Sequence, residues 1–265
     1  MKAFDKQISD KASLFPVSTH ATAIVGSIGV GKTTVLLNLL LLGGWCRYYN
    51  RIILVSPTAM LDSKLRNLTE AMVVKTNIPL EKQIEEDELS LQDEPRQPTI
   101  FPKYKKIEEN DIHTEYDHSI IADLVKWQKE VIAEYGEDLC DRVLLVLDDA
   151  IQLGCFDLKR KNLLTRSITE CRHTKISVVM LSQYFKSIPP VVRTCLTALF
   201  FPECNKTEKE HIFSTFHLNM PFHKWDEYTS VICHKEHTFC QINKLNPRGF
   251  KLIKSDKEFI RQRIT

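Results

Sequence analysis

One stretch decides the fold of this chain, Gly26-Ser27-Ile28-Gly29-Val30-Gly31-Lys32-Thr33, which matches the pattern G-x-x-x-x-G-K-[ST] at every fixed position. Only eight glycines occur in 265 residues, and three of them lie within this stretch. Glycine adopts backbone conformations that other residues avoid, so successive N–H groups and the start of a following helix can converge on an anion. The stretch therefore predicts a phosphate-binding loop.

Two side chains of this loop carry the expected chemistry. We expect Lys32 to hold the β- and γ-phosphates of a nucleotide and the Thr33 hydroxyl to ligate Mg²⁺. A chance glycine turn before a helix is the alternative, and the flanking strand and helix disfavour it. The other predicted nucleotide-binding positions are Gly26, Ser27, Ile28, Gly29, Val30, Gly31 and Thr34.

Strands and helices alternate on both sides of the loop. Short apolar runs predict strands, and amphipathic stretches predict helices between them. The predicted strands are 21–25, 51–56, 142–147, 176–182 and 196–201, and the predicted helices are 32–42, 61–74, 119–135, 157–171, 206–216 and 222–233. A hairpin-like pair follows at 237–243 and 249–253. This alternation predicts an α/β fold with a mainly parallel central sheet flanked by helices.

Two carboxylates follow the continuous apolar run that ends at Leu147. Asp148 is therefore predicted at the carboxyl end of a buried strand, where open α/β sheets bind their ligands. This is a Walker B arrangement, in which Asp148 is the expected Mg²⁺ partner and Asp149 polarises the attacking water. The alternative is a solvated helix cap or turn, where aspartate is also common.

A further polar pair, Ser182-Gln183, lies at the carboxyl end of the strand predicted at 176–182. Its amide is expected at the same sheet edge as Lys32 and Asp148, where it could sense a γ-phosphate. Taken alone, a glutamine after a strand is more often a surface side chain.

The order of these motifs resembles the FtsK/HerA superfamily of ATPases, specifically the poxvirus-like genome-packaging ATPases of large DNA viruses and virophages. The resemblance covers residues 21–201, most of the chain. It departs from the FtsK-like pattern at Asp149, where glutamate is common. The residues that carry it are 26–34, 143–149, 171–175, 181–185, Ile188-Pro189 and Arg193.

The resemblance implies a RecA-like P-loop NTPase that hydrolyses ATP with Mg²⁺ in a homo-oligomeric ring and moves double-stranded DNA into a preformed capsid. It implies a capsid or portal-vertex protein as partner, and a location in the host cytoplasm, at the viral factory, or with the virion. In such rings an arginine of one subunit reaches the γ-phosphate of its neighbour. Arg172 is the first candidate, Arg193 the second and Arg166 the third. A solvated side chain or a salt bridge unrelated to phosphate is the alternative for each, and it is favoured for Arg166.

Two other functions are compatible with a phosphate loop. A P-loop kinase, or another nucleotide-binding protein acting on a small-molecule acceptor, would leave Ser182-Gln183 unexplained. A non-catalytic assembly factor gated by nucleotide would predict loss of the loop lysine or of the acidic pair, and both are present. We therefore rank the DNA-translocating ATPase first.

Charge and composition bound the organisation of the chain. The net charge is only +2, but residues 81–94 are strongly acidic and residues 241–265 are basic. We divide the chain into an ATPase core at 1–201, with an acidic insertion or loop at 77–116, and a basic extension at 202–265 packed on the same domain. The segments 159–161 and 241–265 could contact DNA phosphates or simply be solvated. We expect no membrane span, because the longest apolar run is far too short.

The eight cysteines are scattered and are expected to be mostly buried thiols in a reducing compartment. Cys233-His234-x-x-His237-x-x-Cys240 has four possible zinc ligands in eight residues. We disfavour a zinc site, because adjacent ligands in a strand-like stretch would point to opposite faces.

Overall fold

The computed structural model describes residues 19–41, 45–59, 61, 65, 111–137, 140–149, 154–156, 163–218, 220–233, 237–244 and 251–254. Their strands form one sheet of order β3-β2-β4-β5-β1-β6-β7-β8. Pairing is parallel from β3 to β6 and antiparallel from β6 to β8. The mainly parallel sheet is therefore confirmed. The strands are β1 (Ala21–Val25), β2 (Arg51–Val55), β3 (Ile112–His113), β4 (Val143–Leu147), β5 (Ile176–Ser182), β6 (Ala198–Phe201), β7 (Thr238–Asn243) and β8 (Lys251–Lys254).

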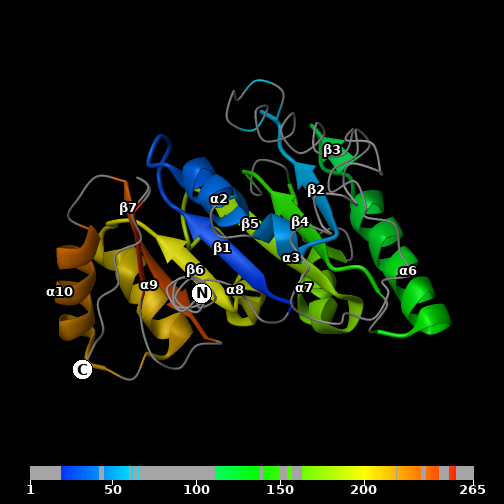
Figure 1. Ribbon diagram of the computed structural model, residues 1–265. Helices are drawn as coiled ribbons and strands as arrows, with labels where there is room; N and C mark the ends of the chain where they lie inside the picture. The colour runs from blue at the N-terminus through cyan, green and yellow to red at the C-terminus, as the bar shows by residue number, and fades with distance from the viewer. Residues whose placement is uncertain are drawn as a thin grey trace, which may run out of the picture.

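Helices cover both faces of the sheet (Figure 1). In β4, Leu144 and Val146 pack in the core under α2 and α3, whereas Val143, Leu145 and Leu147 pack in the core on the opposite face. A strand buried on both faces must be apolar throughout, which explains the continuous apolar run. One face carries α2 (Lys32–Leu41) and α3 (Trp45–Tyr48), and the other carries α6 (His118–Tyr135), α7 (Leu163–Thr174), α8 (Pro190–Cys195), α9 (Lys206–Phe216) and α10 (Phe222–Cys233).

Several predicted elements lie partly or almost wholly outside the described residues. The helix predicted at 61–74 lies almost wholly outside the described residues, as does the start of the helix predicted at 157–171. Most of the predicted insertion at 77–116 also lies outside them. Its last part contains β3, which pairs in parallel with β2 and was not among the predicted strands. A two-residue edge strand has no periodic pattern to detect.

The C-terminal residues continue the central sheet. β7 pairs with β6, and β8 pairs with β7, which confirms the predicted hairpin. The extension therefore shares its sheet with the ATPase core, and the division at residue 201 stays an interpretation. Among the described residues, none of the helices has the length and apolar character needed to cross a bilayer.

Candidate functional site

The phosphate loop leaves the sheet at the carboxyl end of β1, between β5 and β6 (Figure 1). The Gly26 N–H donates to the Ser182 carbonyl at 3.1 Å, so the loop begins level with the end of β5. Gly31 has a φ of 104°, and a Cβ on Gly26 would lie 2.7 Å from a methyl group of Val30. The glycines at these two positions are therefore required by conformation and by space.

Lys32 opens α2 and folds across the loop. Its ammonium donates to the carbonyls of Gly26 and Ser27, at 2.8 and 3.0 Å. Burial lowers the pKa of Lys32, whereas the nearby charges of Asp148 and Asp149 act to raise it. The Lys32 ammonium and both carboxylates therefore lie close enough at this sheet edge to interact electrostatically.

Asp148 is held in place by the neighbouring strand. The Ser56 hydroxyl donates to Asp148 Oδ2 at 2.8 Å, and the Asp148 N–H donates to the Val55 carbonyl at 2.9 Å. Ser56 is fully buried, so the contact is shielded from solvent. Sequence reasoning missed Ser56, although a serine directly after β2, at the same edge as Asp148, could have suggested it.

Asp149 follows in a left-handed backbone conformation, with a φ of 53°. Strain of this kind gathers at functional sites, and aspartate tolerates it better than most residues. Burial raises the pKa of the Asp149 carboxyl, while the charge of Lys32 acts to lower it. A carboxylate with a raised pKa is a better proton acceptor.

Gln183 lies at the end of β5, between the strand that precedes the phosphate loop and the strand that precedes the acidic pair. β5 lies between β1, which leads into the phosphate loop, and β4, which leads into the acidic pair. Gln183 directly follows β5 and is half-buried. The strand order therefore brings Gln183 to the sheet edge that carries Lys32 and Asp148.

The candidate arginines have different surroundings. Arg172 belongs to α7, and its side chain lies outside the described part of the chain. The Arg193 guanidinium lies 5.5 Å from the centre of the Phe185 ring, and its buried Nε finds no hydrogen-bond partner among the described residues. Arg166 donates to Glu170 at 2.7 Å within the same helix, so the salt-bridge interpretation is confirmed for Arg166.

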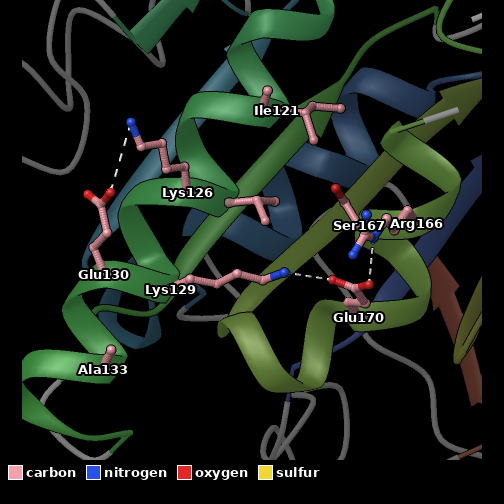
Figure 2. Close-up of a pocket in the computed structure, with 10 residues that line it drawn as sticks. Ile121, Lys126, Lys129, Glu130, Ala133, Arg166, Ser167 and Glu170 are labelled. Carbon is pink, nitrogen blue, oxygen red and sulfur yellow. Dashed lines mark hydrogen bonds and ion pairs between the residues drawn. The ribbon is translucent and has the colours of Figure 1, made fainter. Parts of the chain in front are cut away.

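The described residues also form a cavity of about 470 Å³ between α6 and α7. Figure 2 shows Lys129 and Arg166 converging on Glu170 at its wall. No residue of the phosphate loop or of the acidic pair lines it. The cavity therefore lies outside the predicted nucleotide site.

A glycine loop between a strand and a helix, with a lysine and an acidic pair at one sheet edge, defines a P-loop nucleotide-binding protein. The chain belongs to the Poxvirus A32 protein family, whose model matches residues 93–242, more than half of its length. That match contains Asp148, Asp149 and Gln183, and the phosphate loop precedes it. The predicted resemblance to poxvirus-like ATPases is thereby confirmed at the level of this family.

Solved structures share the fold. The genome packaging NTPase B204 from Sulfolobus turreted icosahedral virus 2, in complex with AMPPCP, is 13% identical with a TM-score of 0.52, over 88% of this chain and 96% of that one. The DNA-packaging ATPase B204 from Sulfolobus turreted icosahedral virus is 11% identical with a TM-score of 0.53, over 89% of this chain and 97% of that one. A comparison with curated protein sequences finds no match. The P-loop NTPase fold predicted from the sequence is confirmed.

Proposed function

We propose that this chain is an ATP-hydrolysing motor that moves double-stranded viral DNA into a capsid. The observation that carries the proposal is the strand order of this chain, in which β5, followed by Gln183, lies between the strands that lead into the phosphate loop and the acidic pair. The match to the Poxvirus A32 family supports the same proposal. The B204 packaging NTPase was solved with AMPPCP and with ATP-gammaS, which supports ATP as the nucleotide. The family match does not favour the kinase alternative.

The donor set fits Mg²⁺. The Thr33 hydroxyl and the Asp148 carboxylate are hard oxygen ligands, and Ser56 already orients Asp148. We assign Thr33 and Asp148 to hold the ion, directly or through water. When bound, Mg²⁺ would neutralise charge on the phosphates.

Each remaining side chain has a proposed task in hydrolysis. Lys32 leaves the loop carbonyls to hold the β- and γ-phosphates, and the loop N–H groups bind the phosphate oxygens. Asp149 orients the attacking water and accepts its proton, which its raised pKa favours. Gln183 bonds to the γ-phosphate, and an arginine of the neighbouring subunit, Arg172 first and Arg193 second, stabilises the developing charge.

The assembly we propose is a homo-oligomeric ring that binds DNA phosphates without reading sequence. Residues 241–265 carry a local charge of +5, and a ring would bring several such segments together. We propose a capsid or portal-vertex protein as partner, and the host cytoplasm, at the viral factory, or the virion as location.

Steady-state ATP hydrolysis tests this function. We would measure it with and without linear double-stranded DNA, at low and moderate salt, for the wild type and Asp149→Asn. We expect stimulation by DNA that weakens with salt, because phosphate contacts release counterions, and loss of hydrolysis in the variant. Asparagine tolerates the left-handed conformation, so the variant should fold. Hydrolysis indifferent to DNA would contradict the motor, and full activity of the variant would contradict the base assignment.

A further inference from the structure

His237 brings the C-terminal extension to the phosphate loop. Its Nδ1 lies 3.1 Å from the Val30 carbonyl oxygen, across 207 positions of sequence. The same atom would lie 3.5 Å from a Cβ on Gly31, so the ring borders both residues of the Val30–Gly31 peptide. A carbonyl only accepts hydrogen bonds, so the Nδ1 must carry the proton and donate it.

The elements around His237 hold it at the height of the loop. β7 begins at Thr238 and pairs with β6, which pairs with β1, the strand that leads into the loop. The buried thiols of Cys233, at the end of α10, and Cys240, in β7, lie 3.2 Å apart. Cys233 and Cys240, which stand before and after His237 in the sequence, are therefore packed in the core.

The backbone of His237 is left-handed, with a φ of 59°. A residue with a Cβ adopts this conformation at a cost, and the surrounding structure must compensate for it. The ring itself is exposed, so core burial of the side chain is not the compensation. In this conformation the ring makes its contact with the Val30 carbonyl.

We propose that His237 is a positioning residue for the phosphate loop, and the proposal rests on the role of that loop as the ATP site. In a trans peptide the C=O and the N–H point in opposite directions. By binding the Val30 carbonyl on the outside of the loop, His237 directs the Gly31 N–H to the inside, where the phosphates bind. His237 touches no phosphate itself, and it couples the C-terminal extension to nucleotide affinity.

Paired histidine variants test this role. His217, the C-cap of α9, is also exposed and left-handed, with a φ of 48°, so it is a matched control for backbone strain. We would titrate His237→Ala, His237→Asn, His217→Ala and the wild type with ATPγS and Mg²⁺ by calorimetry, after thermal melts that confirm folding. We expect about three- to tenfold weaker binding for His237→Ala, the worth of one hydrogen bond. His237→Asn should recover part of it, because asparagine donates and tolerates the conformation.

Four results of this titration would overturn the inference. Wild-type affinity in His237→Ala would show that the contact does not organise the loop. Equally weakened ATPγS binding in His217→Ala would show a general effect of replacing a left-handed histidine. Equal loss of affinity in His237→Asn and His237→Ala would show that a hydrogen-bond donor at position 237 does not matter. A wild type that does not bind ATPγS would remove the nucleotide site and this inference together. A wild type that binds ATPγS but ignores DNA would contradict the motor alone and leave the His237 comparison valid.

Discussion

Single residues set the position of the two carboxylates, Asp148 and Asp149, in the candidate site. Ser56 reaches Asp148 from the neighbouring strand, and Asp149 holds a conformation that few residues accept. Both features position carboxylates that we propose to act on the bound metal and on the attacking water. Their effects can therefore be separated by substitutions that leave the phosphate loop intact.

Ser56→Ala should lower ATP hydrolysis about 10- to 100-fold, the usual effect of removing a group that orients a metal ligand. The Asp148 carboxylate would lose the hydroxyl that fixes its rotamer. The measurement is steady-state hydrolysis across a Mg²⁺ titration. Ser214→Ala, which removes an exposed helix hydroxyl, is the control. Equal rates at all Mg²⁺ concentrations for Ser56→Ala and the wild type would refute the role of Ser56.

Asp149→Glu should lower the free energy of unfolding by about 1 kcal/mol, because glutamate accepts a left-handed backbone less readily than aspartate. This preference gives a physical reason for aspartate at a position where related ATPases commonly have glutamate. Thermal melts of Asp149→Glu and Asp149→Asn provide the comparison. The explanation fails if the glutamate variant melts at or above the asparagine variant.

At the scale of elements, buried polar groups join neighbouring segments. His20 lies directly before β1, where its Nδ1 is 2.8 Å from the Thr22 hydroxyl and its Nε2 contacts the Tyr49 hydroxyl after α3. Burial lowers the pKa of His20 to about 3. The neutral ring therefore belongs to the folded state at every pH near neutrality.

Stability should fall as the pH drops below the ordinary histidine value of about 6.5. Below that pH, His20 binds a proton in the unfolded chain, whereas in the folded chain it stays neutral down to about pH 3. The free energy of unfolding therefore falls by about 2 kcal/mol at pH 5 because of this group. Urea unfolding at pH 7.5 and pH 5 measures it, with His20→Gln as the comparison. The variant should lose less stability between the two pH values, and an identical loss would contradict the assignment.

Lys209 joins α9 to the start of α10. Its side chain is 3% exposed, and its ammonium lies 2.7 Å from Glu203 and 2.8 Å from Asp226. Lys209→Ala should cost about 2 kcal/mol, less than for a fully buried pair, because both carboxylates remain partly hydrated. Chemical denaturation measures the loss, with the exposed Lys206→Ala on the same helix as control. A loss no larger than that of the control would show that the ion pairs add nothing.

If an arginine of the neighbouring subunit completes the ATP site, a single chain holds only part of that site. Arg166 is engaged by Glu170 in its own chain, which leaves Arg172 and Arg193, and Arg172 stays the first candidate. Arg172→Ala should keep ATPγS binding and lose hydrolysis. Mixing it with Lys32→Ala should restore part of the activity, because one interface then holds Lys32 of one subunit and Arg172 of the other. No recovery in the mixture would contradict completion in trans, and full activity of Arg172→Ala would contradict its assignment.

Local pattern was enough to predict the phosphate loop, the acidic pair, β5 and most helices of the described chain. Each of these depends on backbone conformation, or on a periodic or continuous run of apolar residues, within a short stretch of sequence, as at Gly31 and along β4. The contacts of Ser56 with Asp148 and of His237 with Val30 span 92 and 207 positions. They exist because β2 pairs with β4 and because β7 joins β6 beside β1, and no local pattern specifies which strands become neighbours. The short elements β3 and α8 likewise depend on the sheet and core around them, since so few residues carry no period of their own.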